Sequence, residues 1–177
     1  MKRFYYILIF SFVLSACGAT VAVDYDSQTD FSQYRSFNFY PDIDSGLSDL
    51  DNQRIVQITD SLMQERGFVR SEQPDLLINF YASESIRNSR NTIGIGVGQS
   101  SRHSSIGISG GIPIGGRIIN QQLTVDFVDR KKDQLIWQAE AYGELKERAT
   151  PEQKEKYYVD VLNKILKKYP GGMSNEE

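Results

Sequence analysis

Apolar and polar residues alternate with a period of two in five segments of the chain, a pattern typical of β-strands with one buried face. The third segment is partly apolar on its second face too, as is usual for a central strand. The last two are joined by a polar turn and predict an antiparallel hairpin. The predicted strands are Val21–Tyr25, Ser36–Tyr40, Asp75–Ser83, Leu123–Val128 and Leu135–Ala141.

Two further segments carry apolar residues at spacings of three and four, which predicts amphipathic helices. The first covers Asp49–Arg66, with Ser48 as its N-cap and Gly67 as the left-handed residue that ends it. The second begins with a capping box over Thr150–Gln153, and its apolar stripe runs to Tyr169. A Pro-Gly pair stops it just beyond.

Together these elements predict an α+β domain, a mainly antiparallel sheet of about five to seven strands with the two helices packed on one face. Residues 17–170 are expected to form this single domain, and the tail 171–177 is expected to be disordered. The only tryptophan, Trp137, is assigned to the core or its edge rather than to a ligand platform.

The first residues predict an export signal. Lys2 and Arg3 precede the apolar run Phe4–Leu14, and two small residues then lead to Cys17. In lipoproteins, lipid is attached to such a cysteine before cleavage, so residues 1–16 should be removed and Cys17 should become the lipid-bearing first residue. The apolar run is shorter than the roughly 20 residues that a membrane-spanning helix needs, which argues against a permanent transmembrane anchor.

The residue after the cysteine bears on which membrane holds the protein. Gly18 stands where an aspartate would resemble the inner-membrane retention signal of Gram-negative lipoproteins. We therefore expect a lipid anchor in the outer membrane, on its periplasmic face. Cys17 is the only cysteine, so the chain cannot form an internal disulfide.

Charge narrows the classes of partner. Two of the 20 Lys and Arg residues lie in the signal peptide, so the mature chain sets 18 basic residues against 23 acidic ones. This balance argues against nucleic acid or anionic headgroups as the main partner, since both reward basic surfaces. The expected partners are the membrane, through the N-terminal lipid, and another envelope protein.

One segment, Asn91–Arg117, is unusual because isoleucine and valine alternate there with glycine on both sides of a serine-rich turn. It predicts two glycine-faced strands that another backbone can approach closely. Three interpretations stay open: an edge packed within the domain, a docking edge for another protein by strand addition, and a mobile flap. The segment lacks the glycine patterns of nucleotide-binding loops. The candidate docking residues are Gly94, Gly96, Gly98, Gly110 and Gly111.

Candidate catalytic chemistry is limited to carboxylates. His103 is the only histidine, so one chain cannot assemble a serine triad or a multi-histidine zinc site, and lipid would occupy Cys17. We therefore assign no catalytic residue, metal or cofactor. The acids that could still converge from the predicted strands are Asp24, Asp26, Asp126 and Asp129.

A further acidic stretch, Asp42–Asp51, has oxygens at spacings similar to those of a calcium loop. It lacks the central Asp-Gly and the bidentate glutamate of an EF-hand. Helix capping by Ser48 explains its last residues without a metal.

Several motifs together resemble the bacterial lipoprotein family catalogued as domain of unknown function 4136. The resemblance runs in order along nearly the whole mature chain. It implies the fold and the lipidation, and no known reaction or catalytic residue. The motifs are Val23–Asp26, Asp30–Phe37, Gly67–Phe68, Pro74–Tyr81, the glycine segment, Leu123–Asp129 and Leu135–Trp137.

Two functional hypotheses follow. The favoured one is a lipid-anchored, non-enzymatic binding or structural module of the cell envelope that faces the periplasm. The alternative is a carboxylate-dependent hydrolase of a periplasmic substrate that uses Asp24, Asp26 and Asp126.

Overall fold

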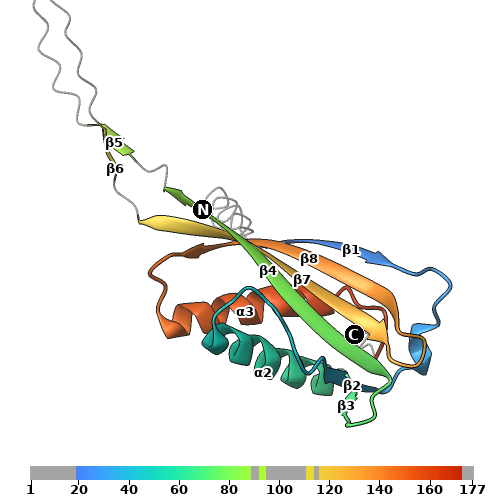
Figure 1. Ribbon diagram of the computed structural model, residues 1–177. Coiled ribbons are helices and arrows are strands. Elements are labelled where there is room, and N and C mark those ends of the chain that lie inside the picture. The colour runs from blue at the N-terminus through green and yellow to red at the C-terminus, as the bar shows by residue number, and fades with distance from the viewer. Residues whose placement is uncertain (1–18, 89–91, 95–110, 114–115, 173–177) are drawn as a thin grey trace, which may run out of the picture.

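A six-stranded sheet with two helices against one face makes up the body of the molecule in the computed structural model (Figure 1). The structure describes residues 19–88, 92–94, 111–113 and 116–172. The predicted α+β class and the number of strands are therefore confirmed. No helix within these residues is long and apolar enough to cross a membrane.

The strand order is β1-β8-β7-β4-β2-β3, and most neighbours are antiparallel. The exception is β2, which runs parallel to both β4 and β3, so the sheet is mixed. Helix α2 lies between β2 and β4 in the chain and provides the long connection that a parallel pair requires. The strands are β1 (Thr20–Tyr25), β2 (Ser36–Phe39), β3 (Val69–Arg70), β4 (Leu76–Asn88), β7 (Arg117–Asp129) and β8 (Gln134–Lys146).

The central strands β4, β7 and β8 each have 13 residues and are longer than predicted. The β7–β8 hairpin was expected, but the pairing continues to Ile118 opposite Lys146. A bulge between Phe127 and Val128 shifts the register near the turn. The added length lies at one end of the sheet, where the alternation is carried by polar residues rather than by a clear apolar stripe.

Both helices begin where their capping residues predict. In α2 (Asp49–Glu65) the Ser48 side chain accepts a hydrogen bond from the backbone N–H of Asp51, and Gly67 beyond its end has a φ of +84°. In α3 (Pro151–Leu166) the capping box is complete. These local interactions fix the first residue of each helix, and the apolar stripe of each helix then packs against the sheet.

The core lies between the helices and one sheet face. Apolar side chains of β4, β7 and β8 interlock there with the stripes of α2 and α3, and Trp137 is 1% exposed, which confirms its core assignment. The largest buried side chains are Trp137, Tyr158, Phe37, Phe80, Phe127, Ile55, Met63, Leu76, Ile78, Leu123, Ile136 and Leu162.

The chain after α3 packs back onto the domain. Tyr169 lies beyond the helix, and its ring is 4.6 Å from that of Phe127 and 5.3 Å from that of Trp137, centroid to centroid. Arg66, at the end of α2, donates from Nη2 to the carbonyls of Tyr169 (2.8 Å) and Gly171 (2.7 Å). We call this contact the C-terminal clasp. Residues 173–177 of the predicted tail lie outside the described residues.

Three elements escaped prediction because they are short or non-local. These are the 3-10 helix η1 (Phe31–Gln33), the two-residue strand β3, and the parallel β2–β4 pairing. In the glycine segment, β5 (Thr92–Gly94) and β6 (Gly111–Pro113) form a separate antiparallel pair with Gly94 opposite Gly111. This pair lies beyond the ends of β4 and β7, away from the helices (Figure 1).

Candidate functional site

The face of the sheet turned away from the helices carries many polar side chains. Because side chains alternate along a strand, the residues between the core positions of β4, β7 and β8 all lie on this face, which we call the open face. Cross-strand rows on it include Ser83–Gln122–Tyr142–Thr20 and Asn79–Asp126–Gln138–Asp24. Amide, hydroxyl and tyrosine side chains predominate there.

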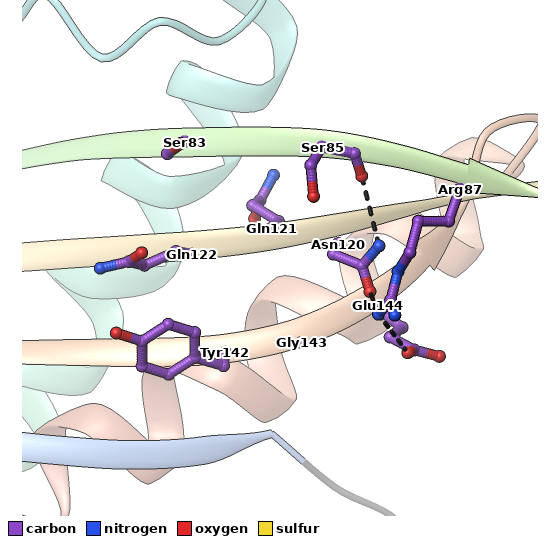
Figure 2. Close-up of a pocket in the computed structure, with 9 residues that line it drawn as sticks. All are labelled: Ser83, Ser85, Arg87, Asn120, Gln121, Gln122, Tyr142, Gly143 and Glu144. Carbon is purple, nitrogen blue, oxygen red and sulfur yellow. Dashed lines mark hydrogen bonds and ion pairs between the residues drawn. The ribbon is translucent and has the colours of Figure 1, made fainter.

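A shallow groove of about 440 Å³ lies at the far end of β4, β7 and β8 (Figure 2). Its lining comes from all three strands, and by alternation most of the side chains belong to the open face. No lining residue is a large aliphatic one. The lining residues are Ser83, Ser85, Arg87, Asn120, Gln121, Gln122, Tyr142, Gly143 and Glu144.

Tyr142 is the aromatic side chain of the groove. It is 47% exposed, and its hydroxyl donates to Glu140 Oε2 at 2.7 Å, two residues back along β8. Figure 2 shows the ring lying along β8 with its flat side toward the viewer. The hydrogen bond to Glu140 raises the pKa of the Tyr142 hydroxyl. The ring is therefore tethered at one end and stays a neutral aromatic surface.

A group of three polar side chains lines the other end of the groove. Arg87 donates to Asn120 Oδ1 and lies 3.5 Å from Glu144 Oε1, while Asn120 Nδ2 donates to the carbonyl of Ser85 at 3.3 Å. These contacts link β4, β7 and β8 (Figure 2). They hold a guanidinium, an amide and a carboxylate together, so the formal charges balance within the group.

Asp126 lies further along the open face, toward the hairpin turn. Its Oδ1 accepts a hydrogen bond of 2.8 Å from Gln138 Nε2, and Asn79 also bonds to it. Burial raises the pKa of Asp126, these two amides oppose the rise, and the charge of Glu140 adds to it. The carboxylate is thus held between two amide side chains.

The predicted carboxylates do not converge. Asp24 shares its row with Asp126, but Gln138 lies between them, and two strand spacings separate their backbones by about 10 Å. Asp26 follows β1 and accepts hydrogen bonds from Gln28 N (2.9 Å) and Thr29 Oγ1 (2.8 Å), which lower its pKa. It shapes a turn.

Asp129 closes the hairpin turn. Burial works to raise its pKa, but the backbone N–H of Lys132, the Tyr34 hydroxyl and the N–H of Lys131 outweigh burial and lower it. The Tyr34 hydroxyl donates at 2.9 Å, and the two N–H groups donate at 2.8 Å (Lys131) and 3.1 Å (Lys132). Asp129 is therefore a structural residue that ties the turn to the segment after η1.

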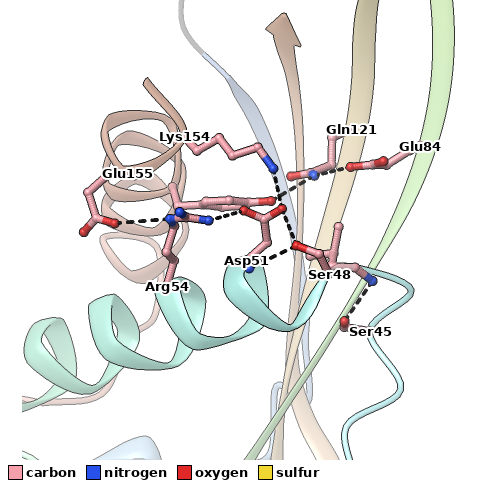
Figure 3. Close-up of polar contacts among 10 residues, drawn as sticks. Ser45, Ser48, Asp51, Arg54, Glu84, Gln121, Lys154 and Glu155 are labelled. Carbon is pink, nitrogen blue, oxygen red and sulfur yellow. Dashed lines mark hydrogen bonds and ion pairs between the residues drawn. The ribbon is translucent and has the colours of Figure 1, made fainter. Parts of the chain in front are cut away.

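Asp51, from the acidic stretch considered for calcium, belongs to an ion cluster between the two helices (Figure 3). It lies 2.6 Å from Lys154 Nζ and 2.7 Å from Arg54 Nη1. Both carboxylate oxygens are thereby engaged by cations of the chain itself. In the part of the chain that the structure describes, no three His, Cys, Asp or Glu side chains gather as metal ligands.

A second polar contact joins α3 to the sheet beside this cluster. Gln121 Nε2 donates to Glu84 Oε1 at 2.7 Å and to the Tyr158 hydroxyl at 3.2 Å. Gln121 is buried, and its side chain lies on the helix-covered face. The helix-covered face therefore carries a buried polar contact at this end, as it does at the opposite end of β7 through Asp129 and Tyr34.

Four predicted site residues lie outside the described residues, as does the only histidine, His103: they are Cys17, Gly96, Gly98 and Gly110. The pairing of Gly94 with Gly111 agrees with the predicted pairing of two glycine-bearing strands, and their role as a docking edge stays a prediction. The groove was missed because the predicted strands stopped at Ser83 and Ala141. Alternation of Asn120, Gln122 and Tyr142 with core positions is the signal that could have found it.

Comparison with known proteins gives a family and a fold. A PDZ domain protein from Parabacteroides distasonis shares 18% identity with a TM-score of 0.52, over 89% of this chain and 37% of that chain. This chain thus spans well under half of that protein, and the likeness concerns the fold alone. PelC from Paraburkholderia phytofirmans, a dodecamer, shares 12% identity with a TM-score of 0.48, over 84% of this chain and 94% of that chain.

No curated protein matches the sequence. A family model does match, over residues 21–171, which is most of the chain and includes every strand of the main sheet apart from the first residue of β1. The chain therefore belongs to the family described as Domain of unknown function (DUF4136).

Proposed function

We propose that the protein is a lipid-anchored component of the outer membrane that faces the periplasm and binds another envelope component without catalysing a reaction. The observation that carries the binding role is the one-sided fold. Both helices cover one face of the sheet, whereas the open face presents a groove lined by polar side chains and Tyr142.

The geometry near the N-terminus links the proposed anchor to this face. Strand β1 begins at Thr20, three residues after Cys17, and Thr20 is paired with Tyr142. Three residues span at most about 11 Å of extended chain. A lipid on Cys17 would therefore hold the groove close to the bilayer surface.

The separation of the candidate carboxylates favours a binding role over the hydrolase alternative. Hydrolysis by two carboxyl groups needs both of them to face one substrate bond. Here Gln138 separates Asp24 from Asp126, and Asp26 takes part in a turn. The glycine pair Gly94–Gly111 offers a second surface, an edge for strand addition by an envelope protein.

The anchor is tested by labelling cells with radioactive palmitate and by fractionating their membranes. We expect label in the wild-type chain, no label in Cys17→Ala, and release of that variant from the membrane. Ser27→Ala, an exposed change in a turn, is the matched control and should behave as the wild type. Equal labelling of Cys17→Ala would overturn the anchor.

The choice of membrane is tested with Gly18→Asp. If the residue after Cys17 directs sorting, this variant should keep its label and move to inner-membrane fractions. A wild-type chain already found in the inner membrane would overturn the proposed location.

The binding role is tested by photocrosslinking in intact cells. A photoreactive residue at Ser83, in the groove, should give a discrete crosslinked product, whereas one at Gln57, exposed on α2, should not. Absence of any product from Ser83 would contradict binding at the open face.

A further inference from the structure

We propose that the groove at the end of the open face binds an uncharged, hydroxyl-rich glycan chain. This inference rests on the binding role proposed above and names the chemical class of the ligand. Four properties of the groove support it: an aromatic platform, free amide and hydroxyl groups, balanced charge, and an open elongated shape.

The platform is Tyr142. A sugar ring has a face made of C–H groups, which packs against an aromatic ring, while its edge carries hydroxyl groups that need hydrogen-bond partners. Tyr142 is 47% exposed, and its tether to Glu140 restrains it along β8. The ring is therefore held in place before any ligand arrives, which lowers the entropy that binding would lose.

The polar partners stand beside the ring. Gln122 is next to Tyr142 in the same row, Ser83 completes that row on β4, and Ser85 with Asn120 forms the next one. No hydrogen bond joins the Gln122 amide or the Ser83 hydroxyl to another residue of the described structure. A primary amide offers two donors and an acceptor, and a serine hydroxyl offers both roles, so together they can satisfy vicinal sugar hydroxyls.

The charge balance selects against ionic ligands. Arg87 faces Glu144 within the groove, and Lys146 and Glu140 lie in adjoining positions of the same face. Neither sign is in excess, so a phosphate, an acidic polymer or a basic peptide would meet an opposing charge as well as an attractive one. Since no lining residue is a large aliphatic one, an acyl chain or an apolar peptide would find little to bury against.

The shape fits a chain rather than a small enclosed molecule. The groove is shallow and crosses three strands, about 10 Å, and the step from Ser83 to Arg87 adds about 13 Å along β4. Small-molecule sites usually enclose most of their ligand, whereas this one leaves a side open. A glycan could therefore enter and leave the groove at its ends.

The test is calorimetric titration of the full-length chain, purified in detergent, with oligosaccharides of defined charge. The uncharged probes are malto-oligosaccharides and N-acetylated chito-oligosaccharides. The cationic probe is deacetylated chitosan oligosaccharide, and the anionic probe is oligogalacturonate. We expect saturable binding of at least one uncharged probe and at least tenfold weaker binding of the charged ones.

Variants assign the binding to the groove. Tyr142→Ala should weaken it by about tenfold, and Tyr142→Phe, which keeps the ring, should stay within about threefold of the wild type. Gln122→Ala should weaken it by about fivefold through the lost amide contacts. Tyr25→Ala, an exposed tyrosine of β1 outside the groove, is the matched control and should bind as the wild type. Thermal unfolding of each variant separates lost binding from lost folding.

Three outcomes would overturn the inference: no uncharged probe binds, a charged probe binds more tightly, or Tyr142→Ala binds as well as the wild type. Lipid labelling and fractionation do not involve the groove. A chain that carries lipid and crosslinks from Ser83 but binds no uncharged glycan would overturn this inference and leave the proposed function standing. Glycan binding without lipidation would overturn the proposed location alone.

Discussion

The two faces of the sheet are built from the same strands, but one is mainly apolar and buried and the other is mainly polar and exposed. On β4, Phe80 is 1% exposed under the helices, and its neighbour Tyr81 is 41% exposed on the open face. On β7 and β8, the buried row of Val125 and Ala139 is followed, one residue along, by the hydrogen-bonded pair of Asp126 and Gln138. One face supplies the buried apolar contacts of the domain, and the other is the face at which we propose that binding occurs.

The largest expected effect on stability comes from substituting two adjacent residues of β4 that lie on opposite faces of the sheet. Phe80→Ala should destabilise the protein by about 3–5 kcal/mol, because it removes a buried ring and leaves a cavity. Tyr81→Ala should lower the free energy of unfolding by about 1 kcal/mol or less. Urea unfolding followed by circular dichroism measures both. Similar losses in the two variants would break the comparison.

Asp51 is a polar residue buried between the two helices. Asp51→Asn should destabilise by about 2 kcal/mol at pH 7, since it leaves Lys154 and Arg54 without their carboxylate in a partly buried site. Lys156→Ala, which breaks an exposed pair with Asp160, is the control and should change stability by less than about 0.5 kcal/mol.

The stability difference between wild type and Asp51→Asn should depend on pH. Burial works to raise the pKa of Asp51, but hydrogen bonds from Lys154 and Ser48 outweigh it, so the folded-state pKa lies below the ordinary value of 3.8. The stabilisation is therefore complete above that value and is lost as the pH falls through the lower folded-state pKa. A difference between wild type and Asp51→Asn that grows as the pH falls below 3.8 would contradict this assignment.

The two faces can also be compared within β8, by substituting the neighbouring residues Gly143 and Glu144. A Cβ atom added at Gly143 would lie 2.6 Å from the Tyr157 hydroxyl oxygen and 2.8 Å from the ring atom Cε2, on the helix-covered side. Gly143→Ala should therefore destabilise by about 1 kcal/mol, with partial relief from movement of the tyrosine. Glu144→Ala, next along the strand, should change the thermal midpoint little. Equal shifts would indicate that α3 does not pack there.

The smallest expected effect has the opposite sign. Burial raises the pKa of Asp126, so ionisation at neutral pH opposes folding, and Asp126→Asn should stabilise the protein by less than about 1 kcal/mol at pH 7. The gain should shrink as the pH falls through the raised folded-state pKa and vanish below 3.8, where wild-type Asp126 is protonated in both states. Destabilisation at pH 7 would mean that the two amides require a charged acceptor.

Sequence patterns predict the parts of this fold that depend on neighbours in the chain. Ser48 and the Thr150–Gln153 box set where the helices begin, and apolar alternation located the core half of each long strand. The parallel placement of β2 beside β4 depends on contacts between distant segments, and local periodicity does not encode it.

The candidate site was harder to predict for a related physical reason. Its strand ends lack a clear apolar alternation and include Ser and Asn, residues that are common in turns, so the predicted strands ended at Ser83 and Ala141. The carboxylates were visible in the sequence, but only the register shows that Gln138 lies between Asp24 and Asp126. Asp129 and Asp51 likewise find partners far away in the chain, Tyr34 and Lys154.

The C-terminal clasp has a practical consequence for anyone who handles the protein. Arg66 holds the backbone carbonyls of Tyr169 and Gly171, and the Tyr169 ring fills space beside Phe127. A stop codon at Lys168 would therefore uncover aromatic surface and leave a half-buried guanidinium without acceptors. An affinity tag at this end of the chain should therefore be placed beyond Gly172, so that these contacts stay in place.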